Sequence, residues 1–279
     1  MRFQNQQDVE VTLNQNTALD VNLPVSLPQI NVITLDHPWR WIAAGWRDLK
    51  AAPWISLSYG MVFLLSSYLL VTLLISAGMT FFIPAMAAGF FLISPLLAFG
   101  LYDVSRSLAR GGQPTFLSSL MSWRRAPFSL LAMGLILMLA FLVWMMLANM
   151  VFAIFFFGIT PDFASALDVL FFSGDSPAFM AAGILSGSII AFAVFCISVI
   201  SVPMIMDRNA DVMSAVITSV RCVSTNPKPL LLWAALIVMF VGLGLVTLFI
   251  GLVIFMPLIG HASWHAYLDL VQPDAGRTD

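Results

Sequence analysis

Long apolar blocks alternate with short polar segments along this chain. The apolar blocks cover approximately residues 54–101, 128–157, 178–205 and 230–270. A membrane-spanning helix needs about 20 residues. The first block, with a turn near 76–80, and the last, with a turn near 246–251, are therefore long enough for two spans each. The pattern predicts an all-α polytopic membrane protein whose six spans form three helical hairpins.

A shorter amphipathic segment precedes each predicted hairpin and ends at a proline. The three segments are "PWRWIAAGWRDLKAAP" (38–53), "TFLSSLMSWRRAP" (115–127) and "DVMSAVITSVRCVSTNP" (211–227). In the first segment, helical spacing separates an apolar face from the basic residues Arg40, Arg47 and Lys50. The apolar face consists of Trp39, Ile42, Ala43, Trp46 and Leu49. Such helices either lie in the lipid headgroup layer or pack together as a cytoplasmic cap. In both cases we expect Trp39 and Trp46 to hold the first segment in place.

Composition supports the membrane assignment. Of the 279 residues, 60% are hydrophobic and only 9% are charged, whereas soluble domains carry roughly 25% charged residues. So much apolar surface cannot be buried in one aqueous core, so lipid is the expected solvent. We expect a flexible polar cytoplasmic tail at 1–36, a membrane domain at 37–271 and a short cytoplasmic tail at 272–279. The expected partners are the bilayer and other membrane proteins, and not nucleic acid.

The positions of Lys and Arg predict the orientation. Four precede the first span, four lie between spans 2 and 3, three lie between spans 4 and 5, and Arg277 follows the last. The loop 158–177 contains three aspartates and no Lys or Arg. Because Lys and Arg concentrate in cytoplasmic loops, we expect both termini in the cytoplasm and loop 158–177 in the periplasm. A chain with five spans would place the C-terminal tail in the periplasm, and Arg277 would then be the one basic residue on that side.

Each hairpin also has a proline in its second arm, and polar residues follow each proline. Tyr102 and Asp103 follow Pro95, Asp207 and Arg208 follow Pro203, and His261 and His265 follow Pro257. Proline removes a backbone hydrogen bond and bends a helix. If the three second arms converge, these polar side chains gather at the cytoplasmic end of the bundle.

Four motifs in this order resemble a known bacterial family, the domain of unknown function 2189. They are "PWRWIAAGWRDL", "SPLLAFGLYDVSR", "SVPMIMDR" and "PLIGHASWHAYLDLV", and the likeness runs from about His37 to Val271. The resemblance implies an integral protein of the bacterial inner membrane. The family has no established activity, so the resemblance transfers no catalytic residue.

The histidine pair is the strongest candidate for a metal site. His261 and His265 stand four residues apart on one helix face, about 6 Å apart along the axis, and two imidazoles at this spacing can bind one metal ion. Further ligands have to come from other spans, with Asp103 and Asp207 as candidates. The alternative is structural: a histidine near a helix end pairs with a carboxylate. We expect His261 to face Asp103 or Asp207 inside the bundle. No cofactor is otherwise indicated, with metal or haem as the open alternative.

Asn149 is the other notable polar residue, because it lies within the apolar run "WMMLANMVF". An amide in hydrocarbon is expected to hydrogen-bond a neighbouring helix; a contact with a transported molecule is the alternative.

Three functions remain open. The leading one is an interaction or assembly protein within the membrane. The second is a channel or carrier for a small neutral solute, although no ionisable residue lies in the middle third of any predicted span, where ion-coupled carriers usually keep one. The third is a metal- or haem-binding redox accessory protein. No catalytic motif is present, so enzymatic activity is not expected.

Overall fold

The computed structural model describes residues 27–155 and 176–272, and these residues are almost entirely helical. No β-strand occurs within these two ranges, where the only extended pairing is an antiparallel bridge between Ile30 and Val271. The predicted all-α class is therefore confirmed for the described residues. The predicted periplasmic loop falls almost wholly outside them.

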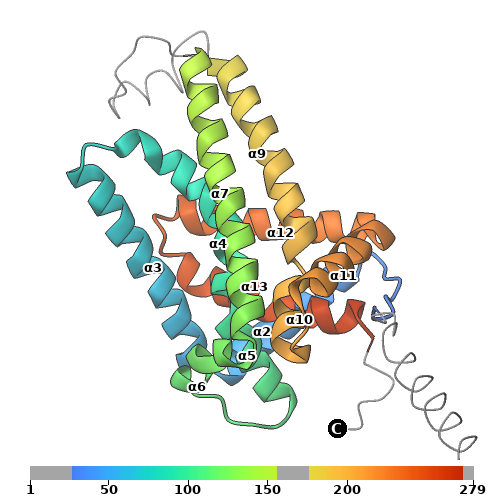
Figure 1. The fold of residues 1–279 in the computed structure, drawn as a ribbon. Helices are drawn as coiled ribbons and strands as arrows, with labels where there is room; N and C mark the ends of the chain where they lie inside the picture. The colour runs from blue at the N-terminus through green and yellow to red at the C-terminus, as the bar shows by residue number, and fades with distance from the viewer. Residues whose placement is uncertain (1–26, 156–175, 273–279) are drawn as a thin grey trace, which may run out of the picture.

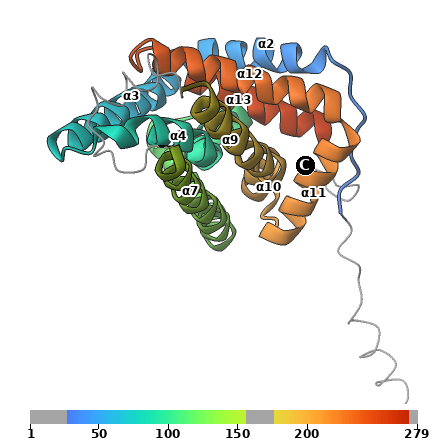
Figure 2. The same ribbon diagram turned by 90° about the horizontal axis from the view of Figure 1, so that it is seen from above.

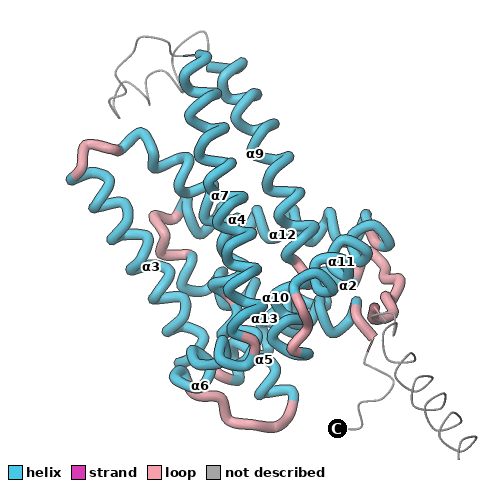
Figure 3. Tube along the Cα trace, in the orientation of Figure 1, coloured by secondary structure: helices cyan, strands magenta, loops and turns pink. Residues whose placement is uncertain are grey.

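Short connections join the helices (Figure 3). In chain order the elements are α2 (His37–Ala51), α3 (Pro53–Ser76), the 3-10 helix η1 (Thr80–Phe82), α4 (Ile83–Leu97), α5 (Phe99–Ala109), α6 (Phe116–Leu120), the 3-10 helix η2 (Met121–Arg125), α7 (Pro127–Phe155), α9 (Ser176–Ser198), α10 (Ser201–Arg208), α11 (Val212–Thr225), α12 (Pro227–Val246) and α13 (Leu252–Leu270). Prolines open α3, α7 and α12, at the helical position where a missing N–H costs no intrahelical hydrogen bond.

Four helical stretches in the described ranges are long and apolar enough to cross a membrane. They are Pro53–Ser76, Pro127–Phe155, Pro177–Arg208 and Pro227–Val246, the third of which combines α9 and α10. The chain is thus a membrane protein that is all-helical, with four membrane-capable helices, over the two described ranges. The two other expected spans fall on α4, which has 15 residues, and on α13, which has 19 residues and a polar second half.

The long helices diverge from a common base. In Figure 1, α7 and α9 rise side by side, α3 leans away from them, and α12 runs crosswise behind. Seen from above, α2, α12 and α13 lie alongside one another (Figure 2). The short segments α5 and α6 lie near the lower ends of α3 and α7, and α10 lies below α9 (Figure 1).

Among the long helices that the structure describes, α13 is the most enclosed, because α2, α3, α5, α10 and α12 all pack against it. Two glycines allow this close packing. A Cβ atom at Gly45 of α2 would lie 2.7 Å from the backbone nitrogen of Ala262, and one at Gly60 of α3 would lie 2.1 Å from the carbonyl oxygen of Val253. Pro257 lacks the N–H that would bond the Val253 carbonyl within the helix. α3 therefore lies directly against a backbone oxygen that has no helical partner.

The first amphipathic segment does not bury the face that its hydrophobic residues predict. In α2, Trp41 is only 2% exposed, whereas Trp39 and Trp46 are 55% and 43% exposed. Trp41 packs edge to face on Trp233 of α12, with ring centroids 5.5 Å apart. The expectation that Trp39 and Trp46 hold α2 by packing within a protein cap is therefore wrong; the small residues Ala44 and Gly45 make the close contact with α13.

The same inversion occurs in the other two segments. Most buried residues in both are small, namely Ser119, Ser122, Ser214, Ala215, Thr218, Ser219 and Cys222, with Val223 in addition. Most of the large apolar residues are exposed, namely Leu117, Leu120, Met121, Trp123, Met213, Ile217 and Val220. Small residues let helices approach closely, so both segments pack on the protein mainly by small residues and leave most of their large apolar residues outside.

Part of the expected N-terminal tail pairs with the helical domain. The backbone N–H of Ile33 donates to the side-chain oxygen of Asn226, and the Asn226 amide donates to the carbonyl of Asn31, at 2.8 and 2.9 Å. The Asn31 amide in turn donates to the carbonyl of Asp269 at 2.8 Å. Residues 30–33 are therefore held against the ends of α11 and α13.

We expect Gly60→Ala to destabilise the protein and Gly242→Ala to leave its stability unchanged or slightly higher. A methyl group at 60 collides with backbone, whereas one at Gly242 in α12 meets no atom within 4 Å. Overpacking of this kind costs about 1–3 kcal/mol, and an unhindered helical alanine is favourable. Thermal unfolding of both variants in mild detergent measures the difference. Equal midpoints for the two variants would contradict the packing of α3 on α13.

Candidate functional site

The polar residues that follow the three prolines converge, as the sequence predicts. They lie on α5, α10 and α13, which contact one another. Arg106 of α5 pairs with Asp207 of α10 at 2.9 Å. The hydroxyl of Tyr267 in α13 donates to the second oxygen of Asp207 at 2.9 Å. We call this group the basal network. It also includes the charged and hydrogen-bonded side chains connected to it, namely Asp103, Arg125, Arg208, Asp48, His261, His265, Ser56 and Ser105.

Two further arginines extend the basal network. Arg125 of η2 pairs with Asp103 at 2.7 Å, and Arg208 donates from Nε to the hydroxyl of Tyr267 at 2.8 Å. Burial raises the pKa of Asp103 above its ordinary value, although Arg125 and Arg106 oppose this shift. The two arginines therefore compensate a carboxylate that is largely removed from water.

His261 is completely buried at the centre of the helical base. Its Nδ1 lies 2.7 Å from the hydroxyl of Ser105 in α5, and its Nε2 lies 2.9 Å from the hydroxyl of Ser56 in α3. The predicted inward orientation is found. The predicted partner is wrong, because two serines occupy both ring nitrogens and Asp103 and Asp207 pair with arginines instead.

The other two histidines connect α13 to α2. His265 Nε2 lies 2.8 Å from a carboxylate oxygen of Asp48, and His37 Nδ1 lies 2.8 Å from a carboxylate oxygen of Asp269. Trp41 donates its indole N–H to the same Asp269 oxygen at 2.8 Å. Sequence reasoning did not find His37 or Asp48, because only the fold brings the ends of α2 beside α13.

Asp48 connects the contacts of His265 with those of His261. Burial alone would raise the pKa of Asp48, but hydrogen bonds from His265 and Ser105 outweigh it, so its pKa lies below the ordinary value. Ser105 also contacts His261. The histidine pair is thus a structural connection between α2, α3, α5 and α13.

The four candidate metal ligands are not brought together. No cluster of three or more His, Cys, Asp or Glu side chains suited to a metal ion occurs among the described residues. His261, His265, Asp103 and Asp207 each have a separate partner. Because His261 has no exposed surface, the Ser–His–Ser contact also offers no nucleophile that a substrate could reach.

A cavity of about 440 Å³ lies beside the basal network. Residues of α4 and α9 form one wall, and residues of α12 and α13 form the other. These two helix pairs are packed internally but make few contacts with each other across the space. The volume falls within the range of roughly 300–1,000 Å³ that is typical of small-molecule sites.

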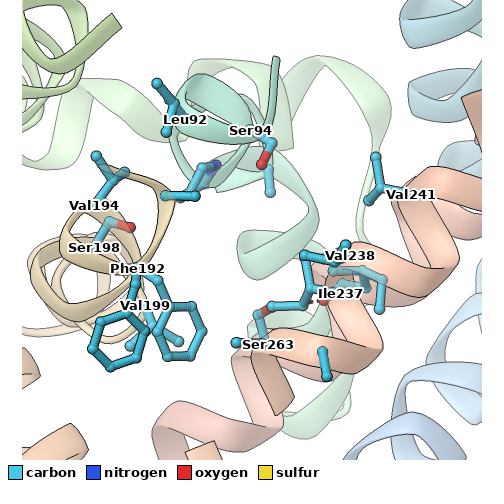
Figure 4. Close-up of a pocket in the computed structure, with 18 of the residues that line it drawn as sticks. Leu92, Ser94, Phe192, Val194, Ser198, Val199, Ile237, Val238, Val241 and Ser263 are labelled. Carbon is cyan, nitrogen blue, oxygen red and sulfur yellow. Dashed lines mark hydrogen bonds between the residues drawn. The ribbon is translucent and has the colours of Figure 1, made fainter. Parts of the chain in front are cut away.

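The cavity lining is apolar and carries no charge. No Asp, Glu, Lys, Arg or His lines it, and its polar members are four serines and Tyr102. Figure 4 shows Ser94, Ser198 and Ser263 at the margin of the open space, each from a different helix. Tyr102 is hydrogen-bonded to Ser263 and is buried at the side of the cavity nearest the basal network. The sequence predicted Tyr102 among the polar side chains that gather at the cytoplasmic end of the bundle, and it did not predict the cavity.

Asn149 has no partner on a neighbouring helix within the described ranges. Its side chain is exposed on α7, and its amide donates only to the carbonyl of Met145 in the same helix at 2.8 Å. The predicted interhelical contact is therefore not made among the residues that the structure describes.

The comparisons with known proteins agree with the resemblance. The sequence profile of DUF2189, described as a predicted integral membrane protein, matches residues 82–207. The matched stretch runs from η1 to α10 and is somewhat less than half of the chain; it includes the motif "SPLLAFGLYDVSR" and all but the last residue of "SVPMIMDR". The search of curated proteins found no match, and neither did the search of solved structures.

We expect Asp48→Asn to destabilise the protein by about 1–3 kcal/mol near neutral pH, because it weakens hydrogen bonds at a half-buried site. The folded-state pKa of Asp48 is lowered. Its stabilisation is therefore fully present above the unfolded pKa of roughly 3.9 and is lost as the pH falls through the folded value. Thermal unfolding of wild type and variant should differ at about pH 6 and converge toward about pH 3.

The matched control is Asp36→Asn. Asp36 is an exposed partner of Arg40 next to the same helix, where water screens the interaction, and we expect little change in the unfolding midpoint. A difference between wild type and Asp48→Asn that grows as the pH falls would contradict the assigned role of Asp48.

Proposed function

We propose that this protein is a six-span protein of the bacterial inner membrane that binds a small neutral molecule in a cavity within the bilayer. The cavity between the α4–α9 wall and the α12–α13 wall carries this proposal. Its uncharged lining suits a neutral molecule, because a charge placed there would lose its hydration without gaining a partner.

Three observations support six spans with the basal network on the cytoplasmic side. All twelve Lys and Arg residues of the chain lie in the segments that a six-span chain places on the cytoplasmic side, where these residues concentrate. α4 follows the membrane-capable α3 after a short turn at Gly78, and α13 follows α12 after a turn at 247–251. α4 and α13 would then return to the base from which α3 and α12 depart.

The exposed faces of α2, α6, η2 and α11 support a position of these segments in the headgroup layer. Trp39 and Trp46 lie on the outer side of α2 together with Arg47 and Lys50. Tryptophan and basic residues are the side chains that favour the membrane interface. This placement gives a role to the large apolar residues that the protein leaves uncovered.

Assembly with another membrane protein is the second candidate, and Asn149 favours it. Its exposed amide lacks an interhelical partner among the residues described here. A polar side chain on a lipid-facing helix stabilises contact with a second helix by about 1 kcal/mol. The two candidates are compatible, because Asn149 does not line the cavity.

The proposed topology predicts the behaviour of a reporter that is active only in the periplasm. Inserted at Gly174, in the lysine- and arginine-free loop, it should be active; fused to the C-terminus, it should be inactive. Membrane insertion of both fusions is checked by immunoblotting. Activity of the C-terminal fusion would exclude six spans.

The proposed binding role predicts that a neutral molecule copurifies with the protein. Ala234→Trp on α12 and Ala191→Phe on α9 fill the cavity from opposite walls. Mass spectrometry of extracts from folded protein in mild detergent should detect a molecule in the wild type that both variants lack. Leu185→Trp, at an exposed position of α9 outside the cavity, should retain it. Equal content in all four proteins would refute the proposed function.

A further inference from the structure

One polar group on the cavity wall lacks a partner. Ser198, at the end of α9, is only 1% exposed. Among the hydrogen bonds within residues 27–155 and 176–272, none involves its hydroxyl. Other serines of this region donate to the carbonyl four residues earlier, as Ser186 and Ser201 do. An unpaired hydroxyl on a residue with so little exposure is unfavourable, so the position of Ser198 requires a reason.

The Ser198 hydroxyl is directed toward the cavity. Figure 4 shows it pointing from α9 into the open space between the two walls. Near it on the α13 wall, Ser263 donates to the carbonyl of Ile259 and is also bonded to Tyr102, so its hydroxyl is already occupied. Ser198 is thus an available hydrogen-bonding group beside an apolar space.

The shape of the cavity indicates a long molecule. On α12 the lining runs from Leu231 to Val241, a distance of about 15 Å along the helix axis. Because α9 and α12 face each other across this space with little contact between them, an apolar chain can enter sideways from the bilayer. No charged side chain lines the cavity that could receive a phosphate, carboxylate or ammonium group.

We propose that the cavity binds a neutral long-chain amphiphile, whose single hydroxyl or carbonyl group hydrogen-bonds to Ser198 and whose chain lies between α9 and α12. This proposal rests on the proposed function and adds the chemical class and the orientation of the bound molecule. The uncharged lining disfavours a charged headgroup inside the cavity.

The test compares a long-chain primary alcohol with the alkane of equal chain length. Native mass spectrometry of the full chain in mild detergent measures apparent affinities for both. One hydrogen bond is worth roughly three- to tenfold in affinity. We expect wild type to bind the alcohol more tightly than the alkane by that factor. Ser198→Ala should remove the preference, and Ser186→Ala, on the same helix but outside the cavity, should keep it.

The cavity-filling variants Ala234→Trp and Ala191→Phe separate the two proposals. If both variants lose the alcohol and the alkane, but Ser198→Ala does not change the preference, the cavity binds apolar molecules and the role of Ser198 is refuted. If wild type binds neither probe, or if both filled variants retain binding, the proposed function fails as well. Thermal unfolding of each variant verifies that it is folded.

Discussion

α13 lies so close to α2 and α3 that only glycine fits at the two contacts. Cβ atoms at Gly45 and Gly60 would overlap with the backbone of α13, and no rotation of a side chain relieves a collision with backbone. This close approach brings His261 within hydrogen-bonding distance of Ser56, and His265 within reach of Asp48. The opposite side of α13 forms part of the cavity wall. The basal network and the cavity thus both depend on the same packed helix.

The proposed position of the amphipathic segments in the membrane accounts for most of their large apolar residues lying outside. In water, the apolar face of a helix turns inward because burial removes it from solvent. In a membrane, lipid tails are as apolar as leucine, and close packing and hydrogen bonds decide which face is buried. In α11, Ser219 of the buried face donates to the carbonyl of Cys196 and accepts from the N–H of Ile200. The same rule selects Ala44 and Gly45 in α2 rather than Trp39 and Trp46.

The sequence was informative wherever a local pattern determines the outcome. Apolar length and proline position predicted where α3, α7 and α12 begin, and equivalent post-proline positions predicted that α5, α10 and α13 converge. Partner identity was not predictable, because it depends on the relative rotation of helices. Asp103 and Asp207 lie on the converging segments, yet arginines neutralise both, while His261 meets two serines. The cavity was also not predictable, since it is a space left where separate helix pairs diverge.

The central claim is that α13 is enclosed by protein whereas α3 and α7 face lipid. Photolabelling in bilayers that contain a phospholipid with a photoreactive acyl chain tests it directly, with labelled residues located by peptide mass spectrometry. The account predicts labelling along the exposed faces of α3 and α7, at residues such as Leu69 and Leu142, and none at His261 and Ala262, on the side of α13 that faces α2 and α3. Labelling of that side of α13 as strong as that of α7 would contradict the account.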